Sequence, residues 1–260
     1  MSERIYTPQH SELVERPRYA APIVEDLLIG GQRLRQAFIE TPMRVAGRDA
    51  PLIADRDIDA AAVVLIRNGF AYRSCALADG RRAILDIVLP GDIAGLDQIV
   101  LARRSGELTA AGRAGYHVLG AAALRQLMTD RSIWLHAMAI IAEARWRADR
   151  LAASIGRLDA QARLCVMLLD IHDRLRRRGL INRPTYNLPL TQEQIADHLG
   201  LTLVHVNRTL RKLREERTVL VDRQVVIIMD VDRLRQYALG LPQAAEMPDF
   251  GVLSEPGSAE

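Results

Sequence analysis

The sequence has little of what a secreted or membrane protein needs. Its two cysteines, Cys75 and Cys165, are far apart and outside any CxxC pair. A disulfide framework or a metal cluster held by cysteine alone is therefore not expected, and both thiols are expected to be reduced and partly buried. No apolar run approaches the roughly 20 residues that cross a bilayer, and the charged, proline-punctuated N-terminus lacks the apolar segment of a signal peptide. We expect a cytoplasmic protein with no membrane partner.

Lysine is almost missing, since Lys212 is the only one among 35 lysines and arginines. The net charge is +3, but residues 241–260 carry four acids and no base, so removing those four negative charges leaves +7 on residues 1–240. Arginine binds phosphates and guanine edges through two parallel hydrogen bonds, which suits a nucleic-acid partner. A GC-rich genome explains the same bias equally well.

The 260 residues, 49% hydrophobic and 26% charged, suffice for one large or two ordinary globular domains. We predict an α+β chain with short β-strands early and helices later, and one or two short helices over 23–40. The predicted strands and the hairpin turns between them are Ala62–Ile66, a turn at Asn68-Gly69, Phe70–Leu77, a turn at Asp79-Gly80, and Arg82–Leu89. Short strands with tight turns favour a sandwich or roll. The predicted parts are an arm (1–22), a roll (23–120), a helix (121–158), a third part (159–240) and an acidic flexible tail (241–260).

Residues 121–156 contain no proline and are predicted to form one long helix. Apolar residues recur along it at spacings of three, four or seven. Such a stripe on a long helix favours pairing with a second copy of the chain, although packing on its own domain is the alternative. The predicted dimer contacts are Leu127, Leu135, Met138, Ile141 and Ala142.

Asp159 is expected to cap a further helix over roughly 160–178, which ends in three arginines and Gly179. The next segment, LTQEQIADHLGLTLVHVNRTLRKL (190–213), has the features of a helix-turn-helix. Thr191 and Gln194 are spaced as in a capping box, and Gly200 permits a left-handed turn. Ala196 is small where the two helices cross. Val206 is placed to hold the second helix on the first.

The second helix of this pair has an outward face suited to the major groove of DNA. Arg208 can bridge guanine O6 and N7, and Asn207 can pair with adenine or position a phosphate. The residues predicted to contact DNA from this helix are Thr202, Leu203, Val204, His205, Asn207, Arg208, Arg211 and Lys212. Thr191 and Gln192, at the start of the first helix, are placed for phosphate. A hairpin over 219–229 follows as a wing, and Arg223 at its tip is placed for the DNA backbone.

The segment LTQEQIADHLGLTLVHVNRTLRKLREE, with the hairpin VLVDRQVVII, resembles the winged helix-turn-helix of the Crp–Fnr regulator family. The stretch VVLIRNGFAYRSCALADGRRAILDIVLPGDIAGL resembles the middle of that family's β-roll effector domain, and the long helix resembles its dimerisation helix. The resemblance covers roughly residues 25–240. It implies a homodimer on a two-fold symmetric promoter site in double-stranded DNA, with RNA polymerase as a further partner. The family's recognition-helix arginine corresponds to Arg208. Val204 stands where many members have glutamate, so the DNA sequence that they bind is not carried over.

The resemblance does not extend to the family's known sensor sites. Gly91–Leu96 matches only the outer frame of the cyclic-nucleotide phosphate cassette, and Arg103-Arg104-Ser105 finds no definite place in it. Residues 1–40 lack the cysteine cluster of oxygen-sensing members. We therefore expect no cofactor and no usual binding of cyclic AMP. The alternative is a roll that responds to a cyclic nucleotide, or to haem held by Cys75 or His117.

Two other classes of function are less well supported. A cyclic-nucleotide-regulated module that acts on something other than DNA would have an intact phosphate cassette and no recognition helix, which is the reverse of this sequence. An enzyme would show metal-ligand spacing, a Ser/His/Asp order or a phosphate loop, and the sequence contains none of these. We therefore do not expect an enzyme.

Overall fold

The computed structural model describes residues 21–53, 62–98 and 106–238. The predicted acidic tail and Arg103-Arg104-Ser105 lie outside the described residues, as does the predicted arm apart from its last two residues. The helices are α1 (Ala21–Ile39), α3 (Ala121–Leu127), α4 (Arg131–Arg157), α5 (Ala160–Arg177), α6 (Gln192–Leu199), α7 (Leu203–Glu215) and α8 (Val231–Tyr237). None of these helices is both long and apolar enough to span a lipid bilayer.

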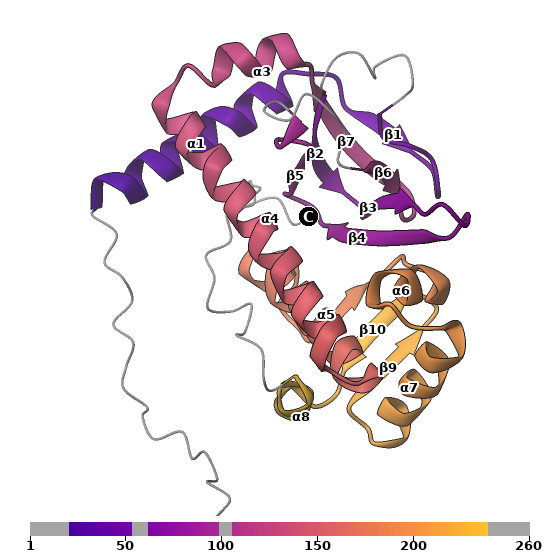
Figure 1. The fold of residues 1–260 in the computed structure, drawn as a ribbon. Coiled ribbons are helices and arrows are strands. Elements are labelled where there is room, and N and C mark those ends of the chain that lie inside the picture. Colours follow the sequence, from indigo (N-terminus) through magenta and orange to yellow (C-terminus); the bar gives the residue numbers. More distant parts are fainter. Residues whose placement is uncertain (1–20, 54–61, 99–105, 239–260) are drawn as a thin grey trace, which may run out of the picture.

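The first part of the chain forms a β-roll of two sheets (Figure 1). One sheet has the strand order β1-β7-β2-β5 and the other β4-β3-β6. Their strands are β1 (Arg44–Ala46), β2 (Val63–Asn68), β3 (Ala71–Ala76), β4 (Arg82–Val88), β5 (Ile93–Ala94), β6 (Glu107–Ala110) and β7 (Ala114–Leu119). The predicted α+β class and the roll are thus confirmed.

Strand β2 is buried on both faces, which explains its unbroken apolar run. Val63 and Leu65 pack with the helices that cover the four-stranded sheet, whereas Val64 and Ile66 point into the space between the two sheets. Side chains alternate across a strand, so a strand covered on both sides needs apolar residues at every position.

The predicted hairpin at Asn68-Gly69 is wrong. Strand β2 pairs with β5 and β7, and β3 pairs with β4 and β6, so the chain changes sheet at this turn. Gly69 supplies the positive φ of 71° that the turn needs, and a side chain there would collide with the backbone oxygen of Arg113. The hairpin at Asp79-Gly80 is confirmed, because β3 and β4 pair across it.

The predicted single helix over 121–156 is also wrong, because α3 and α4 are separate. The carboxylate of Asp130 accepts hydrogen bonds from the backbone N–H groups of Ser132 and Ile133 and thereby caps the start of α4. Aspartate favours such a cap over a position inside a helix. Residues 23–39, for which one or two short helices were predicted, belong to the single helix α1. This helix lies directly on α4, since a side chain at Gly30 would overlap Ser132.

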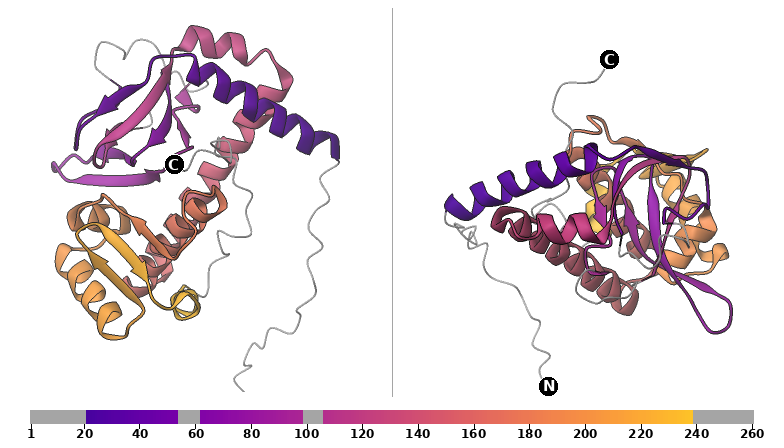
Figure 2. Two further views of the ribbon diagram at one scale, coloured as in Figure 1. Left: turned by 180° about the vertical axis from the view of Figure 1, so that it is seen from behind. Right: turned by 90° about the horizontal axis from the view of Figure 1, so that it is seen from above.

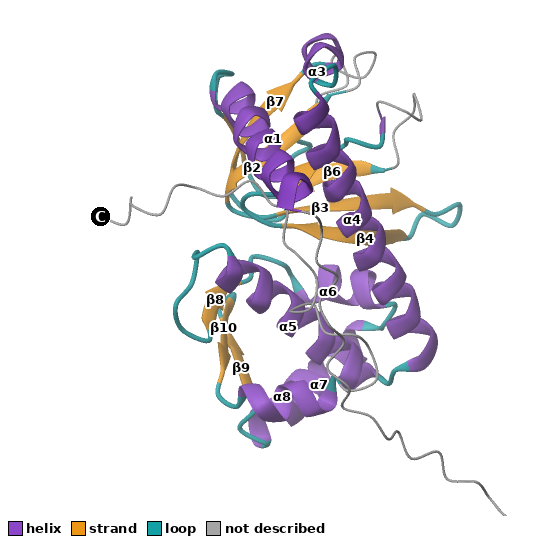
Figure 3. Cartoon of the chain, turned by 90° about the vertical axis from the view of Figure 1, so that its left-hand side faces the viewer, coloured by secondary structure: helices purple, strands orange, loops and turns teal. Residues whose placement is uncertain are grey.

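The last part of the chain forms a second compact unit beside the roll, and α4 runs along both (Figure 3). It contains α5 to α8 and a three-stranded sheet in the order β8-β10-β9, made of β8 (Thr185–Asn187), β9 (Val219–Asp222) and β10 (Val225–Ile228). Its core is continuous with the roll, since Tyr72, Ile84 and Ile87 belong to the same buried cluster as Leu168 and Leu199. Figure 2 shows from behind that the two units lie against each other.

Candidate nucleic-acid interface

Helix α6 and the turn after it form from local signals. The Thr191 hydroxyl accepts a hydrogen bond from the Gln194 N–H, and the Gln194 side chain accepts one from the Thr191 N–H, so the predicted capping box is present. Gly200 ends the helix at φ 63° and ψ 38°, the left-handed conformation that glycine adopts at little cost. Thr202 then caps α7 by accepting from the N–H of His205.

The inner faces of α6 and α7 pack as the sequence predicts. Ala196 and Val206 are buried where the helices meet, and Val206 is fully inaccessible to solvent. Ile195, Leu199 and Leu213 complete the buried contact. This packing fixes the rotation of α7 and leaves its opposite face in solvent.

The predicted DNA-contacting residues of α7 lie on this solvent-exposed side. Val204 is 63% exposed and Leu203 is 40% exposed, although both are apolar. The exposed residues at the start of α7 and along it are Thr202, Leu203, Val204, His205, Asn207, Arg208, Arg211 and Lys212. Exposed apolar side chains on a well-packed helix are typical of a surface that meets a partner.

The polar side chains on this side of α7 differ in whether they already have a hydrogen-bond or ion-pair partner within the protein. Asn207 donates to the backbone oxygen of Leu203 at 3.1 Å, and Arg211 pairs with Glu215 at 2.8 Å, which raises the arginine's pKa. Lys212 lies 3.9 Å from Glu216. Arg208, by contrast, is exposed and has no hydrogen bond or ion pair within the described part of the chain. Its guanidinium is therefore available to a ligand.

The wing is a hairpin of β9 and β10, as predicted, with Arg223 and Gln224 in its two-residue turn. Both have positive φ, 43° and 71°, as a tight hairpin turn requires. Arg223 is exposed. Strand β8, which pairs with β10, was not predicted from the sequence. Thr191 and Gln192, at the start of α6, are exposed beside this sheet, with the Thr191 hydroxyl committed to the helix cap.

Helix α6 also contacts the roll, which the sequence alone did not indicate. Three polar contacts make this junction: Gln194 to Asp49 at 3.0 Å, Arg82 to Asp197 at 2.8 Å, and His198 to the backbone oxygen of Ile84 at 3.1 Å. Burial lowers the pKa of His198, which favours its neutral form. Helix α6, which supports the recognition helix α7, is thus held against the β-roll.

A buried ionic cluster forms a second junction between the two units. Asp92, in the turn after β4, accepts hydrogen bonds from Arg174 of α5 and from Arg178, the residue that follows α5. The burial of Asp92 alone would raise its pKa, but Arg174 and then Arg178 outweigh that effect and hold it well below the usual range. The sequence predicted that the arginines at the end of α5 stabilise the C-terminal end of that helix. Arg178 is instead buried against the roll.

The candidate sensor residues in the roll are placed as follows. Gly91 has a positive φ of 91° in the turn after β4, and Leu96 is buried. His117 lies buried on β7 with Nδ1 3.0 Å from the backbone oxygen of Thr41. Cys75 lies on β3, in the other sheet. Cys165 is buried in α5, and burial raises its pKa to about 12, so it is a thiol rather than a reactive thiolate.

The predicted dimer residues fall on two faces. Leu127 of α3 and Ile141 of α4 pack partly against the core under α1. Leu135, Met138 and Ala142 follow one another on the opposite side of α4, where Ala142 is exposed and the other two are half-buried. Trp134, nearby on the same helix, is 48% exposed.

Comparison with known proteins agrees with this geometry. A family model described as a Crp-like helix-turn-helix domain matches residues 162–237. The nitrogen fixation regulation protein FixK of Rhizobium meliloti (strain 1021) is 33% identical over 164 residues, which cover 61% of this chain and 70% of FixK.

Solved structures have the same fold. The structure of FixK2 from Bradyrhizobium japonicum superposes with a TM-score of 0.65 at 22% identity and covers 78% of this chain and 99% of that one. TTHB099, a transcriptional regulator of the CRP family from Thermus thermophilus, superposes with a TM-score of 0.61 at 21% identity, covering 78% and 100%. At these identities the structural likeness establishes the fold alone.

Proposed function

Because the chain belongs to the Crp–Fnr family of transcription regulators, we propose that it binds a two-fold symmetric promoter site as a homodimer, with α7 in the major groove. As a member of this family it is a DNA-binding regulator. RNA polymerase is the proposed further partner, and the cytoplasm is the proposed place of action. FixK is a nitrogen fixation regulation protein and TTHB099 is a transcriptional regulator, so we propose no enzymatic activity for this chain.

The exposed face of α7 carries the proposal. Arg208 is in the middle of that face, unengaged by the described residues, while Val204 and Leu203 offer apolar contact one turn earlier. A long arginine at this place reaches base edges in the groove, and a bidentate contact to guanine is the commonest specific contact of this kind. Arg223 in the wing is proposed to contact the phosphate backbone instead.

The second part of the proposal is the homodimer. Leu135, Met138 and Ala142 share one outward face of α4, a 27-residue helix. A second copy that packs along this stripe would place two recognition helices about one helical turn of DNA apart, as a two-fold site requires. The roll is proposed to lack the usual cyclic AMP site, because the phosphate cassette is incomplete in the sequence.

Replacing Arg208 by alanine tests the placement of α7. Arg208→Ala should cost about 1–3 kcal/mol for the cognate site and relax the preference at one guanine in each half-site. Affinity for random DNA should fall much less, because that affinity comes from phosphate contacts. The measurement is fluorescence anisotropy with cognate and scrambled duplexes at several salt concentrations.

Arg223→Ala is the matched variant. It should weaken binding to all sequences alike and reduce the salt dependence. If Arg208→Ala weakens cognate and scrambled duplexes equally, Arg208 is a phosphate contact and α7 is not placed in the groove as proposed.

A further inference from the structure

Val204, near the start of the recognition helix α7, is an apolar side chain that takes no part in the core. It is 63% exposed, whereas Val206, two positions later, is fully buried. Successive residues of an α-helix are turned by about 100°, so Val204 and Val206 point to nearly opposite sides of α7. Val204 therefore points to the side of the helix that is proposed to enter the major groove.

The fold gains little from a valine at this position. Its branched side chain has a lower helix propensity than alanine, and a side chain that stays exposed contributes little apolar burial. Branching also leaves one strongly preferred χ1 rotamer in a helix, so the two methyl groups of Val204 have a defined direction. A contact with a partner accounts for this residue better than a role in folding.

The polar side chains next to Val204 are turned back on the helix. The Thr202 hydroxyl accepts a hydrogen bond from the His205 N–H and lies 3.0 Å from Nδ1 of the same histidine. The Asn207 amide donates to the backbone oxygen of Leu203 at 3.1 Å. The start of α7 thus presents an apolar side chain to the groove, and the guanidinium of Arg208 follows one turn later.

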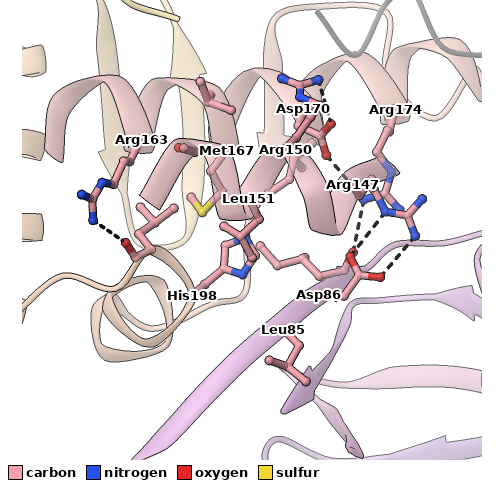
Figure 4. A pocket seen from close by; sticks show the side chains of 15 residues that line it. Leu85, Asp86, Arg147, Arg150, Leu151, Arg163, Met167, Asp170, Arg174 and His198 are labelled. Atoms are coloured by element: carbon pink, nitrogen blue, oxygen red, sulfur yellow. Dashed lines mark hydrogen bonds and ion pairs between the residues drawn. The ribbon is translucent and has the colours of Figure 1, made fainter. Parts of the chain in front are cut away.

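The turn that leads into α7 is held in place from behind. Figure 4 shows Arg163 of α5 and His198 of α6 where these helices meet the roll. Arg163 donates to the backbone oxygen of Leu199, the last residue of α6, at 3.2 Å. His198 lies 3.1 Å from the backbone oxygen of Ile84 in the roll. Because the end of α6 is held on two sides, Val204 is positioned before DNA binds, and a contact made by it costs little further ordering.

We propose that Val204 determines specificity by contacting the C5-methyl group of a pyrimidine in each half-site, an inference that rests on the proposed function. In the major groove the base edges present hydrogen-bond donors and acceptors, and the C5-methyl group of thymine is the apolar group among them. A valine side chain cannot form a hydrogen bond, so this methyl group is its favourable partner. 5-Methylcytosine carries the same methyl group at the same ring position and is the second source of it.

The spacing of Val204 and Arg208 limits where the methyl group lies. Residues four apart are separated by about 6 Å along the axis of an α-helix, and base pairs are stacked about 3.4 Å apart. The methylated pyrimidine, on either strand, is therefore expected within about two base pairs of the guanine that Arg208 contacts.

The test uses the full chain and the duplex that it selects from a random pool. Deoxyuridine in place of the thymine near the selected guanine removes one methyl group and leaves every hydrogen-bonding group of the base in place. The affinity should fall about fourfold when one half-site is changed and about 15-fold when both are changed. Fluorescence anisotropy at constant salt concentration measures this.

Val204→Ala identifies the side chain that makes the contact. Alanine is the better helix former, so the variant should fold, and the thymine and deoxyuridine duplexes should bind to it with nearly equal affinity. Val45→Ala is the matched control, because Val45 is a 54% exposed valine of the roll, and it should leave the preference for thymine at the parent value. Arg208→Ala should lose the preference for guanine and keep the preference for thymine over deoxyuridine.

A second pool, in which 5-methylcytosine replaces cytosine, separates the two sources of the methyl group. Selection of thymine at this position from both pools identifies thymine, and selection of cytosine there from the methylated pool alone identifies 5-methylcytosine. If no duplex is selected from either pool, the proposed function itself is contradicted. If a selected duplex loses no affinity when the pyrimidine methyl groups near the guanine are removed, or if the loss is the same in Val204→Ala, the role of Val204 is overturned while the proposed function stands.

Discussion

Asp92 is the residue on which the junction between the two units depends most directly. Its carboxylate accepts from two arginines whose side chains are 2% and 1% exposed, and from the backbone N–H of Leu89 at 2.7 Å. Asp92→Asn keeps the shape but removes the buried negative charge that both guanidinium groups contact. We expect the free energy of unfolding to fall by about 3–5 kcal/mol, the usual result of breaking a buried pair from one side. Urea denaturation followed by circular dichroism measures this.

The same residue predicts how stability depends on pH. The folded pKa of Asp92 lies below its unfolded value, because the neighbouring arginines outweigh the effect of burial. The contribution of Asp92 to the free energy of unfolding is therefore complete above the unfolded pKa of about 3.8–3.9. It is lost as the pH falls from there through the folded pKa. Asp92→Asn should reduce the loss of stability between about pH 4 and pH 2. Asp149→Asn, at a surface carboxylate of α4, should leave both the stability and its acid dependence nearly unchanged.

Single residues were predictable where their role is local. Thr191, Gly200 and Thr202 act on the backbone within a few positions, and the sequence alone identified all three. The role of Arg178 was not predictable, because its partner Asp92 lies 86 residues away in the chain. Nothing in a run of three arginines distinguishes a buried side chain from one at a helix end.

Among the elements, α4 carries the predicted contact between two copies of the chain. Met138 lies on its outward face between Leu135 and Ala142. Met138→Glu places a charge where the partner helix is expected, and burial of an unpaired charge is costly. We expect the dimer, with an interface on the order of 2,000 Å² or more, to dissociate at micromolar concentration in sedimentation velocity.

Ala122→Glu, an exposed residue of α3 outside the stripe, is the control and should stay dimeric. A parent protein that sediments as a monomer at micromolar concentration contradicts the interface itself. A Met138→Glu variant that remains a dimer shows that the copies meet through another surface.

Elements were predictable to the extent that their partners are near in sequence. The helix-turn-helix and the hairpin at Asp79-Gly80 close within a few residues, and both are present. Strand β2 ends in an equally good turn at Asn68-Gly69, yet its partners are β5 and β7. Strand pairing is decided by burial on both faces, which no turn signal encodes. The break before α4 did have a signal, since Thr129 and Asp130 favour a helix start.

At the scale of the whole molecule, α6 belongs at once to the recognition unit and to the junction with the roll. Arg82 donates to Asp197 through Nε at 3.0 Å and through Nη2 at 2.8 Å, and its guanidinium stacks on the ring of Tyr72 at 5.2 Å. The Tyr72 hydroxyl lies 3.2 Å from Asp49, which also accepts from Gln194. None of these contacts joins residues that are neighbours in the sequence, so the local spacing and capping signals did not predict them.

Arg82 and Asp197 are therefore expected to couple the two units measurably but weakly. Their side chains are 38% and 30% exposed, and a partly solvated pair contributes at most about 1 kcal/mol. A double-mutant cycle with Arg82→Ala and Asp197→Ala should give a coupling energy in that range in the free energy of unfolding. Hydrogen exchange should rise in α6 and β4 in both single variants, because each end of the pair restrains the other element.

The neighbouring hairpin supplies the matched control. Arg81 is paired with Asp79 at 2.7 Å in the exposed turn between β3 and β4, with no part in the junction. Arg81→Ala removes the same kind of side chain one position away and should leave exchange in α6 at the parent level. Equal exchange in α6 for Arg81→Ala and Arg82→Ala would mean that the apolar core shared by the two units holds them together without this pair. A change confined to Arg82→Ala means that a polar contact on the roll restrains the helix on which the recognition helix rests.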